Sequence, residues 1–196
     1  MKKIVLASAS PRRKELMALI TTDYEVITAD VDERSIENSL QGKPANYVAA
    51  ALARAKAQAV YDTLSDSDKK VCAVIGADTS VIIDDKILGK PSSKEDARNM
   101  LTSLSGRTHS VVTGVAIVTS EGVDEFVEES IVEFSPLDEY QKNLIERYIN
   151  TDEPYDKAGG YGIQQGGALL VKSVSGDYFN VVGLPVMKLA RKITDL

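Results

Sequence analysis

The segment from Val71 to Ile75 is wholly apolar, and it leads directly into Gly76-Ala77-Asp78-Thr79. A short apolar run without alternation is typical of a strand that is covered on both faces of a sheet. Such a strand needs flanking helices, because each apolar face has to be buried against another element. The run therefore predicts a layered fold in which helices pack on a sheet.

The other periodic segments agree with this layered arrangement. Strands are expected at Ile4–Leu6 and Tyr24–Thr28, and a hairpin from Val81 to Leu88. Further strands are expected over Ser110–Thr119, Val123–Phe134 and Ala168–Val174, the first two pairing antiparallel. The expected fold class is α/β, of the mixed α+β kind, with a central mixed β-sheet flanked by helices.

Capping residues indicate where the helices start. Ser10-Pro11 predicts a helix start, because serine is a preferred N-cap and proline is tolerated at the first helical position. Ser92 with Glu95 forms a capping box, and Ser135-Pro136 begins another helix. A long helix opens at Pro44 and a last one covers Pro185–Ile193. The apolar face of the long helix is expected to contain Val48, Ala51, Leu52, Ala55 and Ala59, with Lys56 at its edge.

Length and composition favour one domain over residues 1–196. The chain has 196 residues, 43% of them hydrophobic, which is enough to bury a core of its own. Its most polar connection, Ser65–Lys70, is short. No apolar stretch approaches the ~20 residues that span a bilayer, and the start is too short for a signal peptide. We therefore expect a cytoplasmic protein with no membrane partner, and a buried structural thiol at Cys72.

Positive charge is concentrated at the start of an acidic chain. The net charge is -6 and the pI is near 4.9, which argues against a nucleic-acid polymer as a partner. In the first turn of the helix that starts at Ser10-Pro11, the free N–H groups face the same direction as Ser8, Arg12 and Arg13. This arrangement binds phosphate in many proteins. The alternative is a capped helix with a solvated basic turn.

Acidic and basic residues after strands are the next candidates for chemistry. Asp78 follows the apolar run and Glu33 follows another expected strand, so both can present oxygens to a hard cation such as Mg²⁺. Lys56 and Lys90 can add positive charge, and a solvated surface charge is the alternative for each. That alternative is weaker for Asp78, because an acid directly after a buried strand must be desolvated, capped or functional.

Other common site types are absent from the sequence. His109 is the only histidine, which argues against His-rich metal sites and a Ser-His-Asp triad, and we expect it to be structural or on the surface. Neither a P-loop nor a dinucleotide fingerprint is present. The glycine-rich stretch 158–177 can approach a ligand closely, and Gln164 can pair with a base edge through a donor and an acceptor. A loop with several turns is the alternative.

Six motifs, taken together, resemble the Maf family. They follow the family's order from residue 4 to about residue 190, so the resemblance covers nearly the whole chain. The motifs are Ser8-Ala-Ser-Pro-Arg-Arg13, Gly76-Ala-Asp-Thr79, Gly89-Lys-Pro91, Ser105-Gly-Arg-Thr-His-Ser-Val-Val-Thr-Gly114, Asp156-Lys-Ala-Gly-Gly-Tyr-Gly-Ile-Gln164 and Val181-Val-Gly-Leu-Pro185.

The resemblance implies both a fold and an activity. The implied fold is a single elongated domain similar to inosine triphosphatases, with an active-site cleft between two lobes, which often forms a homodimer. The implied activity is house-cleaning hydrolysis of a nucleoside triphosphate to the monophosphate and pyrophosphate, dependent on a divalent metal, Mg²⁺ or Mn²⁺. The Tyr-Gly-Ile-Gln form resembles the branch that hydrolyses dTTP and UTP. Gln165 departs from the family pattern, where glycine is more usual.

The resemblance also implies roles for individual residues. Asp78 is implied as the proton acceptor, and Glu33 together with Asp78 as the metal contacts. Substrate choice is implied for Arg12, Thr79 and Gln164. The implied phosphate contacts are Ser8, Arg13, Lys56 and Lys90.

Two other functions remain as alternatives. The family's older name, septum formation inhibitor, suggests a nucleotide-binding regulator of cell division that does not need turnover. A pure binder, however, has no need for Asp78 beside a metal site. A phosphatase that releases single phosphates is the second alternative, but Asp30-Val-Asp-Glu-Arg34 does not match the nucleophilic Asp-x-Asp-x-Thr sequence.

Overall fold

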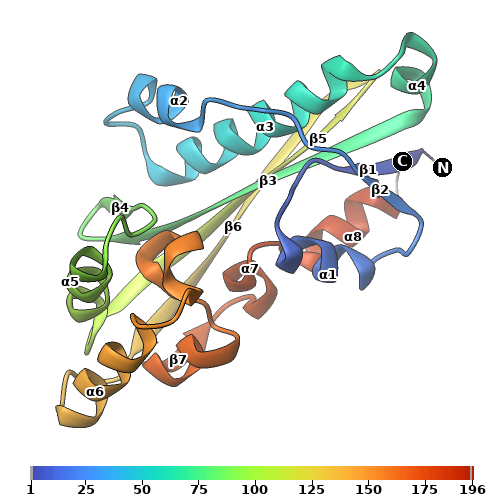
Figure 1. Ribbon diagram of the computed structural model, residues 1–196. Helices are drawn as coiled ribbons and strands as arrows, with labels where there is room; N and C mark the ends of the chain where they lie inside the picture. Colours follow the sequence, from blue (N-terminus) through green and yellow to red (C-terminus); the bar gives the residue numbers. More distant parts are fainter. Residues whose placement is uncertain (1, 195) are drawn as a thin grey trace. The chain divides into compact units, whose positions relative to one another are not determined.

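Strands and helices alternate along most of the chain in the computed structural model, which describes residues 2–194 and 196 (Figure 1). The strands are β1 (Lys3–Leu6), β2 (Tyr24–Val26), β3 (Cys72–Ile83), β4 (Lys86–Leu88), β5 (Thr108–Thr119), β6 (Gly122–Phe134) and β7 (Val171–Ser175). The helices are α1 (Pro11–Ala18), α2 (Glu33–Ser39), α3 (Ala45–Thr63), α4 (Asp66–Val71), α5 (Lys94–Leu104), α6 (Glu139–Tyr148), α7 (Tyr178–Val182) and α8 (Val186–Thr194). The short 3-10 helices are η1 (Glu153–Asp156), η2 (Ala158–Gly160) and η3 (Gln165–Leu170).

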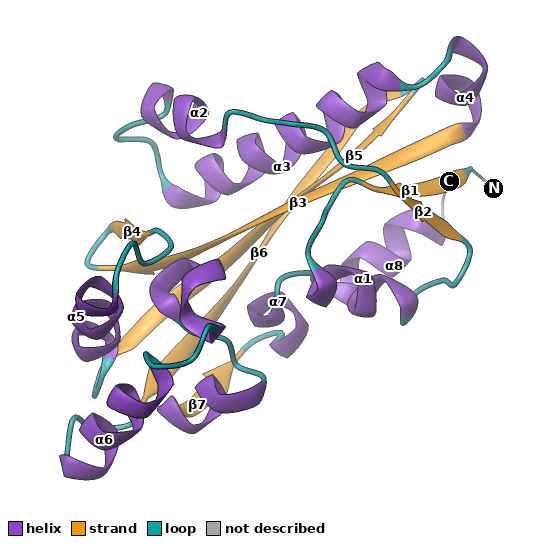
Figure 2. Ribbon diagram, viewed as in Figure 1, coloured by secondary structure: helices purple, strands orange, loops and turns teal. Residues whose placement is uncertain are grey.

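The sheet is mixed, which confirms the predicted fold class. Among the described residues its strands follow the order β2-β1-β3-β5-β6-β7, with β4 paired to β3. Strand β1 is parallel to both neighbours, placing Val5 opposite Glu25 and Val74. The pairs β3–β4 and β6–β7 are antiparallel, and the first is the expected hairpin. Helices flank this central sheet (Figure 2).

The chain divides into two compact units that share the long strands. The first contains residues 1–78, 113–128 and 183–196, and the second contains residues 79–112 and 129–182. The description of the chain as one domain stays a prediction, as do its elongated shape and the cleft between lobes.

In the first unit, helix α3 packs closely on the sheet. A Cβ on Gly76 of β3 would overlap the carbonyl oxygen of Ala53 and lie 2.7 Å from the Ala57 nitrogen. A Cβ on Gly114 of β5 would overlap the backbone at Ala49. These two glycines let the helix backbone approach the strands.

The buried face of α3 contains different alanines from the predicted ones. Ala49, Ala53 and Ala57 are fully buried, whereas Ala51, Ala55 and Ala59 are only partly buried. Val48 and Leu52 are buried as predicted. The close approach at Gly76 and Gly114 requires the smallest side chains of α3 to face the strands. Hydrophobic periodicity alone cannot tell which of several neighbouring alanines faces the sheet.

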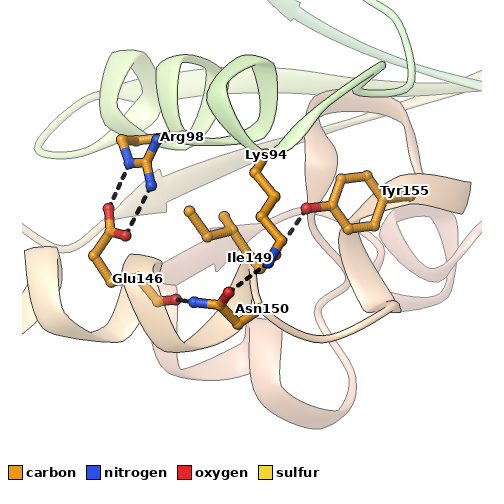
Figure 3. Close-up of polar contacts among 6 residues, drawn as sticks. All are labelled: Lys94, Arg98, Glu146, Ile149, Asn150 and Tyr155. Carbon is orange, nitrogen blue, oxygen red and sulfur yellow. Dashed lines mark hydrogen bonds and ion pairs between the residues drawn. The ribbon is translucent and has the colours of Figure 1, made fainter.

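The second unit has its own apolar core beneath α5 and α6. Leu101, Leu104, Phe134, Leu144 and Ile145 are all buried there. At the surface, Arg98 of α5 donates to Glu146 of α6 at 2.5 and 2.9 Å, and Lys94 donates to Asn150 at 2.7 Å (Figure 3).

Several predicted boundaries are wrong by a few residues. The N-cap of α5 is Ser93, which accepts from Asp96 N–H, rather than Ser92. The N-cap of α6 is Asp138, because the backbone at Ser135 still bonds to Leu170. Residues 165–170 form η3, so β7 starts only at Val171.

Another segment also differs from the prediction. The polar connection Ser65–Lys70 folds largely as α4, with Ser65 as its N-cap. Cys72 is buried as expected. Among the described residues, no helix has both the length and the apolar character that a bilayer span requires.

Candidate active site

Three charged side chains from different elements meet in the first unit. The Lys56 ammonium of α3 lies 2.7 Å from Asp78 Oδ1 on β3 and 2.9 Å from Glu33 Oε2 on α2. The side chains of Lys56 and Asp78 are 17% and 13% exposed, so this ion pair is largely removed from water. Glu33 is half exposed and closes the cluster on the solvent side. We call these three residues the charged cluster.

Close helix packing explains why Lys56 reaches Asp78. Gly76 brings the backbone of α3 against β3, and Lys56 lies next to Ala57, which contacts this glycine. The prediction that Asp78 follows the strand is wrong, because β3 continues to Ile83 and Asp78 lies within it. Gly76-Ala77 is therefore a point of close approach inside a strand.

The predicted position of Glu33 after a strand is also wrong. Strand β2 ends at Val26, and Glu33 is the first residue of α2. Asp32 is the N-cap of this helix and accepts from Ser35 N–H at 3.0 Å. The neighbouring carboxylates thus have different tasks, because Asp32 caps the helix while Glu33 pairs with Lys56.

The basic turn, which runs from Ser8 to Arg13 at the start of α1, is built as predicted. Ser10 caps α1 and accepts from Arg13 N–H at 3.5 Å, while Ser8 Oγ accepts from Ser10 N–H at 3.3 Å. Pro11 occupies the first position of the helix. The N-terminus of α1 and the side chains of Arg12 and Arg13 therefore belong to one short segment.

Arg13 has a defined orientation. Its Nε donates to the carbonyl oxygen of Gly183 at 2.8 Å, so the Val181–Pro185 motif orients the guanidinium. Burial lowers the pKa of Arg13, and the negative charges of Asp78 and Glu33 partly oppose this. The basic turn and the charged cluster are thus electrostatically coupled in the first unit.

The donor set of the cluster suits a hard divalent cation. Glu33 and Asp78 direct carboxylate oxygens at the same ammonium, and carboxylates with water are typical ligands of Mg²⁺. The part of the chain that the structure describes contains no group of three or more His, Cys, Asp or Glu arranged to hold a metal. A cation between Glu33 and Asp78 would therefore need water or substrate oxygens to complete its coordination.

The remaining predicted site residues belong to the second unit. Thr79 follows Asp78 directly on β3, Lys90 is exposed after β4, and Gln164 is half-buried before η3. Gly159 N–H donates to the Gly89 carbonyl at 3.0 Å. This bond joins the turn that carries Lys90 to the glycine-rich segment that carries Gln164.

Comparison with known proteins identifies the family. The model of the family described as "Maf-like protein" matches residues 3–196. The chain belongs to the Maf family. A Maf relative from Bacillus cereus, named dTTP/UTP pyrophosphatase, is 44% identical over 98% of this chain and 95% of its own length. Relatives with the same name from Thermosipho africanus and a Geobacillus species are 47% and 45% identical, covering 95% and 100% of this chain and 89% and 99% of their own lengths.

A solved structure outside these relatives has a lower similarity. The Ham1 protein of Staphylococcus aureus aligns with a TM-score of 0.47 and 19% identity, over 68% of this Maf chain and 72% of its own.

Two structural contributions to the Maf site were not predicted from the sequence. Gly183 orients Arg13 through its carbonyl, and Gly76 allows α3 to approach Asp78. His109 is buried and bonded to Tyr161, which excludes the surface position that was one of its two expected settings. Side-chain chemistry gives no signal for either glycine, since both act through the backbone.

Proposed function

We propose that this chain is a nucleoside triphosphate pyrophosphatase that hydrolyses dTTP and UTP to the monophosphate and pyrophosphate. The observation that carries the proposal is the charged cluster beside the basic turn, in a chain that matches proteins named dTTP/UTP pyrophosphatase over nearly their full length. Carboxylates next to several cations suit a reaction that binds a polyanion and activates water.

The cations bind and polarise the triphosphate in this proposal. Arg12 and Arg13 extend from the start of α1, where the helix dipole also favours negative charge. Arg13 is oriented by Gly183 before substrate arrives, which reduces the entropy lost on binding. Ser8, Lys56 and Lys90 are the further phosphate contacts.

Glu33 and Asp78 would hold a divalent metal, Mg²⁺ or Mn²⁺. When bound, such an ion neutralises phosphate charge and polarises the phosphoryl oxygen that it contacts. Lys56 occupies the position between the two carboxylates, so it keeps both near one point. Binding of a cation would compete with this ammonium for the same oxygens.

Asp78 is the proposed general base. It accepts a proton from the water that attacks the α-phosphorus of the triphosphate. The bond between the α-phosphorus and the oxygen of the pyrophosphate leaving group then breaks. A tight inner-sphere ligand is a poor base, so we assign Asp78 a shared or outer-sphere metal contact. Lys56 orients the carboxylate of Asp78 through the 2.7 Å ion pair.

Gln164 is the proposed reader of the base. Its amide offers one acceptor and two donors, which matches the adjacent C=O and N–H groups on the edge of uracil or thymine. Arg12 and Thr79 are the other proposed determinants of substrate choice. The cytoplasmic location, the homodimer and a role in septum formation stay predictions.

The test is incubation of the protein with UTP and Mg²⁺, followed by separation of the products. We expect UMP and pyrophosphate in equal amounts, and loss of both when the metal is chelated. Orthophosphate without pyrophosphate would indicate a phosphatase, and unchanged UTP with measurable UTP binding would favour the nucleotide-binding regulator. A panel of dTTP, CTP and 7-methyl-GTP then tests the choice of base, and preference for 7-methyl-GTP would contradict the role of Gln164.

A further inference from the structure

The only histidine of the chain is buried in the second unit, and none of the roles assigned above uses it. His109 lies on β5 and is 3% exposed. Its Nε2 lies 2.7 Å from the hydroxyl of Tyr161, which is 5% exposed. Its Nδ1 has no hydrogen-bond partner among the residues that the structure describes. A buried polar ring with a single bond needs a reason for its presence in a core.

Aromatic packing fixes the orientation of both rings. His109, Phe134 and Tyr161 contact one another edge to face, with centroids 5.2, 5.4 and 4.8 Å apart. Edge-to-face contacts favour defined ring orientations. The Tyr161 hydroxyl is thus held at one point, and the hydrogen bond to His109 determines that point.

Tyr161 begins the segment that ends in Gln164. Gly162 N–H donates to the hydroxyl of Tyr148 at 3.2 Å, so a second tyrosine holds the same backbone one residue later. Ile163 is buried, whereas Gln164 is half-buried. The segment therefore has anchored residues at 161–163 and a more accessible amide directly after them.

Neither ring of the pair carries charge near neutral pH. Burial lowers the pKa of His109 to about 4 and raises that of the Tyr161 phenol. A neutral pair is suited to orientation and not to proton transfer.

We propose that His109 is a positioning residue for base recognition, acting through the Tyr161 hydroxyl to hold segment 161–164 and thereby the amide of Gln164. The inference rests on the proposed function, because it assigns a purpose to the orientation of Gln164. It extends that function to a residue that lies in the core and touches no substrate.

The first measurement is hydrogen–deuterium exchange of residues 159–167 without nucleotide. Tyr161→Phe removes only the hydroxyl, and His109→Leu removes the bond from the other side. Both are expected to raise exchange in this segment. His109→Gln places an amide nitrogen near the position of Nε2 and should restore the wild-type level. Tyr155→Phe is the matched control, because it removes a hydroxyl that bonds to the Ile149 carbonyl outside this segment.

The second measurement is the ratio of kcat/KM for UTP and CTP in the same variants. We expect this ratio to fall by about three- to tenfold in Tyr161→Phe and His109→Leu, the size of one net hydrogen bond. The loss should come mainly from a higher KM for UTP, with kcat largely kept. The ratio should stay near the wild-type value in His109→Gln and Tyr155→Phe.

These results separate the two proposals. Unchanged exchange, or an unchanged ratio in Tyr161→Phe with an active wild type, would overturn the positioning role and leave the proposed function standing. A wild type that does not hydrolyse UTP would remove the proposed function and with it the specificity role. If His109→Leu does not fold, Tyr161→Phe compared with His109→Gln decides the same question.

Discussion

The charged cluster of the first unit and the His109–Tyr161 pair of the second unit place polar groups in the interior in different ways. Lys56 and Asp78 keep 17% and 13% of their side chains exposed and neutralise each other. His109 and Tyr161 are almost fully buried, and both are neutral. Charges that are to meet phosphate have to remain accessible, because burial of an ion costs far more than burial of a neutral group. The comparison separates groups suited to react from groups suited to orient.

The largest expected effect is that of Asp78→Asn. The variant should fold but lose turnover of UTP by ~10²-fold or more, because the amide cannot accept the proton from water. Steady-state release of pyrophosphate measures the loss, and thermal unfolding tests the fold.

The matched control for this substitution is Asp84→Asn. Asp84 is an exposed carboxylate that pairs with Arg107 in the second unit. Its replacement should leave turnover unchanged. Near-normal turnover in Asp78→Asn would defeat the assignment of the base.

The second prediction concerns stability at acidic pH. The pKa of His109 is about 4 in the folded protein against an ordinary value of 6.5. As the pH falls below 6.5, the unfolded chain binds the proton first, so the free energy of unfolding decreases until about pH 4. The full loss from this residue is at most about 3 kcal/mol.

Thermal unfolding of the wild type and His109→Gln from pH 7.5 to 4 measures this contribution. Carboxylates add their own dependence in both proteins, so the difference between the two curves isolates the histidine. Parallel curves would show that His109 is not held neutral by burial.

The third prediction concerns the packing that forms the charged cluster. Gly76→Ala places a methyl group against the Ala53 carbonyl and should lower the free energy of unfolding by about 2 kcal/mol. It should also lower turnover, since α3 must move and Lys56 moves with it. Gly89→Ala is the control for stability, because a Cβ there meets no atom within 4 Å. Equal stability of both variants would contradict the close-approach role of Gly76.

The smallest expected effect is that of Arg98→Ala. Arg98 is exposed and bonds to Glu146 across α5 and α6 (Figure 3). Exposed ion pairs add little stability, because water screens the charges and the side chains lose entropy. Turnover should be unchanged, and the melting temperature should fall by less than in Gly76→Ala. A larger fall than in that variant would mean that α5 and α6 depend on this pair.

The elements with strong local signals were predicted correctly from the sequence. Ser10-Pro11 begins α1 and Pro44 precedes α3. The hairpin of β3 and β4 lies where two short apolar runs on either side of Asp84-Asp85-Lys86 indicated. Each of these local signals depends on residues that are neighbours in the chain. The start of α6 was misplaced, because a bond from Ser135 to Leu170 extends the strand-like backbone, and no local pattern reveals such a partner.

The sequence by itself determined the mixed α/β class, the basic turn and the family, because strand and helix periods, caps and motif order are properties of neighbouring residues. Only the tertiary structure decided that Glu33 and Asp78 share Lys56, that Gly183 orients Arg13, and that His109 is buried against Tyr161. These contacts join residues 22 to 170 positions apart. Their geometry depends on how closely backbones pack, which residue type alone does not specify.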